Sequence, residues 1–251
     1  MDIENSIMAT KQGFEHSFSS GDFYNKQTQD GHHLKKILDF LPFEAGMKIL
    51  DLGTGSGYLS FPIAKKYPNT TIIGLDIVEK ALEVNRFKAK EKNVQNISFI
   101  TYDGINFPFA DNEFDMVISR YALHHFPNIQ KSISEISRVI KSDGFLFISD
   151  PTPNVNDTSR FVDGYMQLKK DGHIKFYTKD EWLQMCEKYG LRFKKSFDST
   201  IRFPKKKDTA YGLDELLKKH GKEIIESYEL EVVEDEIYIT ERVNNILFCK
   251  R

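Results

Sequence analysis

The sequence predicts an α/β protein built on a doubly wound, mostly parallel sheet with helices on both faces. Short apolar runs alternate with helical patterns through the middle of the chain, at the spacing of βαβ units. A glycine-rich segment, Asp51-Leu-Gly-Thr-Gly-Ser-Gly57, joins a predicted strand to a predicted helix. Because ligands bind beyond the carboxyl ends of parallel strands, the residues that follow each strand are the candidates for a site.

The predicted elements follow one another with short connections. Strands are expected over 47–52, 70–75, 97–101, 114–119, 144–149, 191–197 and 245–249. Helices are expected over 57–66, 78–92, 129–140, 178–189 and about 210–227. The clearest helical signal is the recurrence of isoleucine at 129, 133, 136 and 140, which is the stripe of an amphipathic helix.

The composition disfavours a nucleic-acid partner. The chain has 251 residues and a net charge of −2, from 35 basic and 37 acidic side chains. A nucleic-acid partner would favour a large basic excess, so none is expected. The short run Pro204-Lys-Lys-Lys207 is interpreted as a solvated turn.

The sequence is typical of a cytoplasmic protein. The two cysteines, Cys186 and Cys249, could pair, but two isolated thiols more often indicate a reducing compartment. The first residues contain no apolar run that resembles a signal peptide, and no segment approaches the roughly 18 apolar residues of a membrane span. We therefore expect no membrane insertion.

The glycine loop and the acidic residue after the second strand predict an adenosine-like ligand. Gly53 and Gly55 let the backbone turn sharply and let a ligand approach its amides. The following helix points unpaired N–H groups at the same place. Asp76, at the end of the second strand, is placed to accept hydrogen bonds from two ribose hydroxyls.

Details of the loop favour S-adenosylmethionine over a dinucleotide. The dinucleotide fingerprint G-x-G-x-x-G would need glycine at position 58, where this chain has Tyr58. Asp51 precedes the loop, and its carboxylate would repel a pyrophosphate but attract the ammonium group of a methionine moiety. A phosphate-binding loop of the G-x-x-x-x-G-K-[ST] type is not present in the sequence.

Five segments in order carry a family resemblance. ILDLGTGSG, GLDI, YDG, FDMVISRYALHHF and ISRVIKSDGFLFISD fall between about 48 and 150. In these segments the chain resembles class I S-adenosylmethionine-dependent methyltransferases, most of all the ubiquinone/menaquinone C-methyltransferase-like group. The resemblance implies a Rossmann-like sheet of seven strands with the last one antiparallel. It also implies S-adenosylmethionine as cofactor and in-line methyl transfer to a small molecule.

The resemblance also implies roles for single residues. The methionine half of the cofactor would lie against Asp51, Gly53, Thr54 and Gly55, the ribose against Asp76, the adenine against Ile77, Asp103 and Gly104, the sulfonium against Ser119 and Arg120, and Tyr24 would be a further cofactor contact. For Asp103 the alternative is a turn-forming Asp-Gly pair.

The candidates for catalysis follow the fourth strand. His124 and His125 could act as a general base, since histidine titrates near neutrality, or could simply pack. Adjacent helical residues point in different directions, so at most one of the two is expected to reach a substrate. Arg120 could bind an acidic substrate or expose its side chain.

Other residues have weaker signals. Tyr24 and Tyr121 could line the site or belong to the core, and His173 could face the substrate. The pairs His32-His33 and His124-His125 lack the spacing of metal ligands, so no metal is expected.

The chain is expected to be one domain, 1–251, monomeric or homodimeric, with two segments that break the strand–helix alternation. Residues 1–32 and 151–177 are predicted to form a lid and a substrate cover; the alternative is that both are ordinary packed helices. Two functions compete with methyl transfer. They are an NAD-dependent oxidoreductase, which Tyr58 disfavours, and a protein that binds S-adenosylmethionine without transferring its methyl group.

Overall fold

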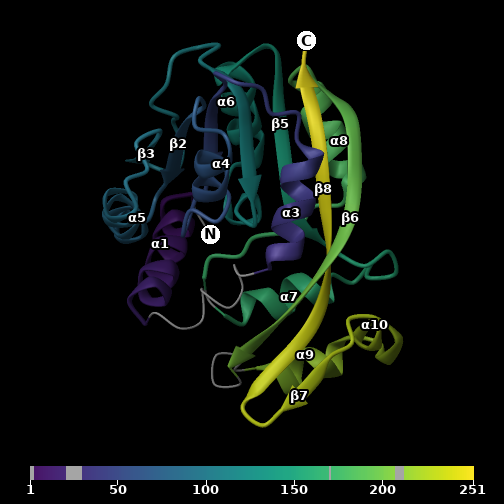
Figure 1. Ribbon diagram of the computed structural model, residues 1–251. Coiled ribbons are helices and arrows are strands. Elements are labelled where there is room, and N and C mark those ends of the chain that lie inside the picture. Colours follow the sequence, from purple (N-terminus) through teal and green to yellow (C-terminus); the bar gives the residue numbers. More distant parts are fainter. Residues whose placement is uncertain (1–2, 21–29, 170, 207–211) are drawn as a thin grey trace.

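The computed structural model describes residues 3–20, 30–169, 171–206 and 212–251. Its centre is one sheet with the strand order β3-β2-β1-β4-β5-β8-β6, and β7 pairs with β8 off this path (Figure 1). The strands are β1 (Lys48–Leu52), β2 (Thr71–Asp76), β3 (Ile97–Thr101), β4 (Phe114–Arg120), β5 (Ile140–Thr152), β6 (Leu191–Lys206), β7 (Glu231–Val233) and β8 (Glu236–Lys250). The α-helices are α1 (Ile3–Ser20), α3 (Gly31–Phe40), α4 (Ser60–Lys66), α5 (Glu79–Glu91), α6 (Ile129–Val139), α7 (Phe161–Gln167), α8 (Lys179–Lys188), α9 (Leu213–Lys219) and α10 (Lys222–Glu226).

The strand directions confirm the predicted sheet. Strands β1 to β5 pair in parallel, and β8 pairs antiparallel with β5 on one side and with β6 on the other. Of the seven strands in the path, only β8, the last strand of the chain, therefore runs antiparallel to the others, and the short β7 is an addition. The order reverses at β1, which has β2 on one side and β4 on the other, so the carboxyl ends of these strands flank the expected ligand crevice.

Both faces of the sheet are covered by helices because its strands alternate apolar side chains between them. Leu50 belongs to a cluster with residues of α6 and α8 on one face, and its neighbour Ile49 packs with α3 and α4 on the other. The predicted helix over 57–66 begins only at Ser60, because Gly57 has a φ of 74° and belongs to the preceding loop.

The last two strands of the path are longer than predicted. β6 and β8 form a long antiparallel pair, named the β6–β8 hairpin, although residues 207–235 connect its two strands. Its pairing continues to Lys206 and Glu236, far past the predicted ends at 197 and 245. The lower half of this hairpin extends beyond the main sheet and carries α7, α9, α10 and β7 (Figure 1). A separate apolar cluster fills this part and includes Phe161, Tyr228 and Ile237.

The single helix expected over about 210–227 is wrong. The chain forms two short helices, α9 and α10, because His220 and Gly221 between them have extended backbone angles. Both cysteines are free, with Cys186 buried in α8. Among the helices that the structure describes, none is long and apolar enough to cross a membrane.

Candidate functional site

The glycine loop after β1 is held against the end of β2. Gly53 has a φ of 69°, and its N–H donates to the Leu75 carbonyl oxygen at 2.8 Å. A Cβ atom at Gly53 would lie 2.3 Å from the Cβ atom of Ala122, which follows β4. Position 53 therefore requires glycine for its backbone angle and for the close approach of two strand ends.

Asp76, at the end of β2, is bound to the same loop. Its Oδ2 accepts from Gly55 N at 2.8 Å and its Oδ1 accepts from Val78 N at 3.0 Å. Burial raises the pKa of this carboxyl, and the backbone hydrogen bonds to Val78 and Gly55 act against the rise. Each oxygen retains a lone pair for a further donor.

Asp51, the last but one residue of β1, is buried and bound by hydroxyl groups. Its Oδ2 accepts from Thr54 Oγ1 at 2.8 Å and from Ser60 Oγ at 2.6 Å. Burial raises the pKa of Asp51 to about 6, although the two hydroxyls favour the charged form. A cation next to this carboxylate would restore its charge.

Two adjoining cavities open at this edge of the sheet. Cavity A encloses about 810 Å³, including space open to solvent, and cavity B about 600 Å³. Cavity A is lined by the glycine loop, the end of β4, the segment from Met166 to Phe176 and the β6–β8 hairpin. Cavity B lies between α1 and the ends of β2 and β3. Four residues line both cavities and mark their junction: Phe14, Gly53, Tyr121 and His125.

Most of the predicted cofactor residues line these two cavities. Asp76, Ile77, Gly55 and Gly104 line cavity B, and Asp51 and Thr54 line cavity A. Several residues of α1 also face cavity B, among them Ile7, Thr10 and Phe18.

Three predicted cofactor contacts are not placed there. Asp103 is exposed, and its side chain accepts from the backbone N–H groups of Ile105 and Asn106, which is the turn-forming alternative. Ser119 is buried, but its hydroxyl donates to the Leu52 carbonyl oxygen and it lines neither cavity. Tyr24 lies outside the described residues.

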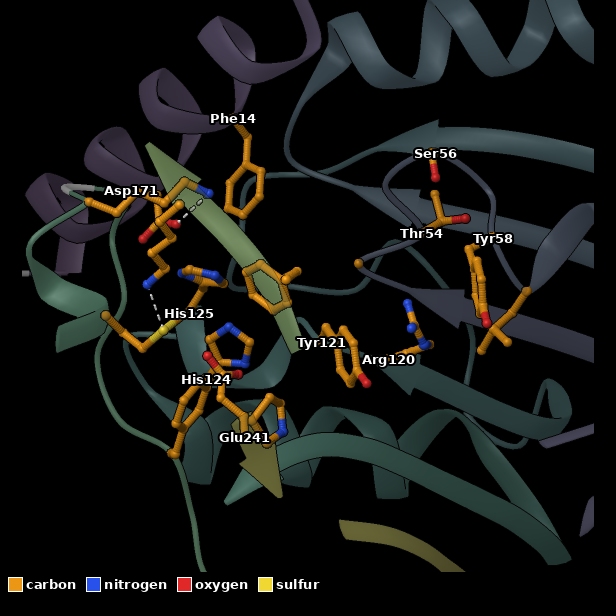
Figure 2. A pocket seen from close by; sticks show the side chains of 18 of the residues that line it. Phe14, Thr54, Ser56, Tyr58, Arg120, Tyr121, His124, His125, Asp171 and Glu241 are labelled. Atoms are coloured by element: carbon orange, nitrogen blue, oxygen red, sulfur yellow. Dashed lines mark hydrogen bonds and ion pairs between the residues drawn. The ribbon is translucent and has the colours of Figure 1, made fainter. Parts of the chain in front are cut away.

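Arg120, at the end of β4, is held between two aromatic rings. The centre of its guanidinium lies 3.9 Å from the ring centroid of Tyr58 and 3.9 Å from that of Tyr121 (Figure 2). Its Nε and Nη2 are buried and have no hydrogen-bond partner in the described part of the chain. Arg120 thus presents oriented donors to cavity A.

His124 and His125 both line cavity A. His124 Nδ1 lies 2.8 Å from Asp150 Oδ1. The imidazole of His125 packs against the ring of Phe14, with 5.1 Å between the ring centroids. His173 is bonded to Asp163, with 2.9 Å between Nε2 and Oδ1, and does not line cavity A or B.

Neither histidine of the pair titrates near neutrality, which corrects the basis of the general-base prediction. Burial lowers the pKa of His124 well below its ordinary value and that of His125 to about 3, and the nearby His173 acts in the same direction on both. Burial also raises the pKa of Asp150 to about 8. Both imidazoles are therefore neutral in this state of the protein.

The hairpin contributes charged residues that the sequence analysis missed. Lys205 on β6 and Glu241 on β8 line cavity A and are only 3% and 1% exposed. The interpretation of Pro204-Lys-Lys-Lys207 as a solvated turn is therefore wrong for Lys205, which lies within a strand. The missed signal is a period of two, because Glu241 continues the buried positions Ile237 and Ile239.

Asp171 and Lys169, from the segment predicted as a substrate cover, complete the polar lining of cavity A. Their side chains form an ion pair of 3.1 Å, and Asp171 is buried. Across the residues that the structure describes, no group of three or more His, Cys, Asp or Glu side chains is arranged to hold a metal ion.

Comparison with known proteins confirms the resemblance. Residues 43–190 match the methyltransferase domain family. YcgJ, an uncharacterized methyltransferase of Bacillus subtilis, is 30% identical over 157 residues, which cover 62% of this chain and 61% of that protein. The chain thus spans about three fifths of the length of that relative. A demethylmenaquinone methyltransferase of Staphylococcus saprophyticus is 30% identical over 178 residues, covering 68% of this chain and 70% of that enzyme.

The fold is also similar to that of a solved structure. The crystal structure of a putative methyltransferase from Bacillus halodurans superposes with a TM-score of 0.77 at 23% identity, over 88% of this chain and 99% of that one. The family match covers the glycine loop, Asp76 and the end of β4, and it ends before the β6–β8 hairpin. This chain belongs to the methyltransferase domain family.

Proposed function

We propose that this protein transfers a methyl group from S-adenosylmethionine to a small-molecule acceptor. The observation that carries the proposal is the junction of the two cavities at Gly53. Asp76 lies on one side of this junction and Asp51 on the other. An elongated ligand with a ribose at one end and an ammonium group at the other fits this arrangement.

The residues present fit that cofactor. Asp76 would accept from both ribose hydroxyls through the lone pairs that Gly55 and Val78 leave open. Ile77 would pack on the adenine in cavity B, with Gly104 beside it. Asp51 would bind the ammonium group, which would offset the cost of its burial.

Arg120 is the proposed site of the cofactor's carboxylate. It lies on the same side of cavity A as Thr54 and Tyr58, which belong to the glycine loop (Figure 2). Its unpartnered, buried N–H groups can bind a carboxylate in a bidentate manner. This proposal replaces the expected role of Arg120 in binding an acidic substrate.

When bound, the cofactor supplies a methyl group that its positive sulfur has already activated. The protein's task is then to hold the acceptor in line at roughly 3 Å and to exclude water. We propose that His125, at the junction of the cavities, positions the acceptor. Its Nδ1 is buried without a partner among the described residues, and its low pKa suits a hydrogen-bond role better than proton storage.

We further propose that α1 and residues 151–177 cover the site as a lid. Phe14 of α1 lines both cavities, and Met166, Asp171 and Phe176 line cavity A. A cover of this kind would shield the reacting atoms from water.

Calorimetric titration with S-adenosylhomocysteine tests the cofactor site. The wild type should bind, and Asp76→Ala should weaken binding at least about tenfold, since two charge-assisted hydrogen bonds are lost. Asp103→Ala is the matched control, because this exposed carboxylate lies in a turn outside both cavities. The affinity of this variant for S-adenosylhomocysteine should stay within about twofold of that of the wild type. A wild type that releases no heat, or an Asp76→Ala protein that binds normally, would contradict the proposal.

A further inference from the structure

Cavity A has a second polar end, opposite the glycine loop. Glu241, Asp171 and His124 lie together on one side of the cavity, and Thr54 and Tyr58 lie on the other (Figure 2). Lys205 and Glu241 come from the β6–β8 hairpin, beyond the residues that match the methyltransferase family. A role in holding the family's shared cofactor would not require them.

Lys205 and Glu241 are buried with incomplete hydrogen bonding. The Lys205 ammonium donates to the Met166 thioether sulfur at 2.9 Å, its one hydrogen bond within the described residues, and thioether sulfur is a weak acceptor. Glu241 Oε1 is buried with no partner in the same part of the chain. The two side chains also form no ion pair within 4 Å of each other.

Among the described residues, Lys205 has only a thioether and the ring of Tyr165 as partners, and Glu241 Oε1 has none. Buried charged groups that lack strong hydrogen-bond partners destabilise a protein, so their presence in a cavity calls for a ligand. Burial lowers the pKa of Lys205 to about 8 and raises that of Glu241 to about 7, while each favours the charged form of the other. Asp171 and Lys169 also face this pair. They form an ion pair through Asp171 Oδ2, and Asp171 Oδ1 is buried without a partner among the described residues. A molecule that brings an anion to the lysine and a hydrogen-bond donor to the glutamate would complete both groups.

The neighbouring walls are aromatic or apolar. Phe176 and Phe203 line cavity A near the segment that includes Met166. The ring of Tyr165 lies 4.2 Å from the Lys205 nitrogen, measured to the ring centroid. This end of the cavity therefore combines a dipolar pair with surfaces that suit a ring or a short carbon skeleton.

We propose that Lys205 and Glu241 recognise the methyl acceptor, and that this acceptor is a small molecule with an anionic group beside a hydrogen-bond donor such as an amine. Lys205 binds the anionic group and Glu241 accepts from the donor. An uncharged quinone would offer no anion to Lys205 and no donor to Glu241. The inference rests on the proposed methyl transfer, and it assigns the acceptor's chemistry to the part of the chain that the family match does not include.

The first test is the double variant Lys205→Met/Glu241→Gln, which removes both charges and replaces each side chain by an unbranched one of similar size. If the pair is retained for a ligand, the melting temperature should stay unchanged or rise by about 2 °C or more, because unpartnered buried charges are removed. The affinity for S-adenosylhomocysteine should stay within about twofold. The control is Arg202→Met/Glu231→Gln, which removes a partly exposed ion pair of 2.8 Å between β6 and β7.

Two results of this test would overturn the inference. A fall in melting temperature of more than about 5 °C would make the pair a structural element of the hairpin. A tenfold loss of affinity for S-adenosylhomocysteine would assign the pair to the cofactor. A wild type that does not bind S-adenosylhomocysteine would instead refute the proposed function.

The second test uses matched acceptor probes on the protein saturated with S-adenosylhomocysteine. L-Tyrosine carries both groups, tyramine lacks the carboxylate, 3-(4-hydroxyphenyl)propionate lacks the amine, and 4-methylphenol lacks both. Calorimetry should give L-tyrosine at least about tenfold tighter binding than 4-methylphenol, and the double variant should abolish the difference. Lys205→Met alone should equalise L-tyrosine and tyramine. Equal binding of all four probes, tighter binding of 4-methylphenol or of the uncharged quinone menadione, or no binding of L-tyrosine would overturn the inference.

Discussion

The two ends of cavity A differ in how their charged groups are satisfied. On the glycine-loop side, Asp51 accepts from two hydroxyls, and next to the loop Asp76 accepts from two backbone amides. On the hairpin side, Lys205 has a thioether and one Glu241 oxygen has no partner among the described residues. The carboxylates at the glycine-loop end are therefore held by the protein itself, and within the described chain only Arg120 keeps unpartnered N–H groups there. At the hairpin end, Lys205 and Glu241 are completed only by a ligand.

This difference separates the shared part of the site from the specific part. Asp51 and Asp76 lie inside the match to the methyltransferase family, and Lys205 and Glu241 lie outside it. A preorganised end suits a ligand that the whole family shares. An end that depends on its ligand discriminates between ligands, because a wrong one leaves buried polar groups unpaired.

The largest effect is expected from a substitution that disturbs only the glycine-loop end of cavity A. Gly53→Ala introduces a Cβ atom 2.3 Å from that of Ala122 at a backbone φ of 69°. Because neither Cβ can rotate away, the loop must move, and the affinity for S-adenosylhomocysteine should fall at least about 100-fold in calorimetry.

Gly46→Ala is the control for this prediction. Gly46 has a φ of 84°, but nothing lies within 4 Å of an added Cβ atom. It should cost about 1–2 kcal/mol of stability from backbone strain and leave ligand affinity within about twofold. Similar affinity losses in both variants would show that backbone strain acts alone, without the contact to Ala122.

The contact between α3 and the β6–β8 hairpin should respond to pH. His33 of α3 is buried, and its Nε2 lies 3.0 Å from Asn245 Oδ1 of β8 and 3.2 Å from Ser199 Oγ of β6. Burial lowers the pKa of His33 to about 4, Arg120 and Lys36 nearby act in the same direction, and Asp30 acts against them.

The sign of the pH effect follows from the lowered pKa. Between pH 6.5 and about 4 the unfolded state binds more protons at His33 than the folded state, so stability falls as the pH falls through this window. The free energy of unfolding should decrease by up to about 3 kcal/mol from this residue, measured by urea unfolding. In the variant His33→Gln, the free energy of unfolding should depend less steeply on pH. An unchanged slope would mean that His33 does not cause this pH dependence.

The smallest effect is expected for α1 and residues 151–177, the proposed lid over the site. If α1 and residues 151–177 form a lid, S-adenosylhomocysteine should slow tryptic cleavage at Lys11 and Lys175 several-fold, since cleavage requires local opening. Cleavage after Lys92, at the exposed end of α5, serves as the internal reference. Equal protection with and without the ligand would identify both segments as ordinary packed structure.

The glycine-loop end of cavity A could be predicted from the sequence better than the hairpin end. Asp51, Gly53 and Asp76 could be recognised because the glycine loop is local in sequence and its acid ends the next strand. The positions of Asp103 and Ser119 could not be predicted, because a side chain at a strand end can turn to its own backbone or to a neighbouring carbonyl. The burial of Lys205 could not be predicted, because a short basic run has the same composition in a turn and in a strand.

The sequence by itself determined the parallel sheet, the order of its elements, the glycine loop and the family, because these depend on periodicity and on motifs within a few residues. The tertiary structure alone decided the length of the β6–β8 hairpin, the burial of Lys205 and Glu241, and the low pKa values of the two histidines. These properties depend on which distant segments meet. Burial and the partners it supplies, rather than residue type, fix the charge and hydrogen bonding of a side chain.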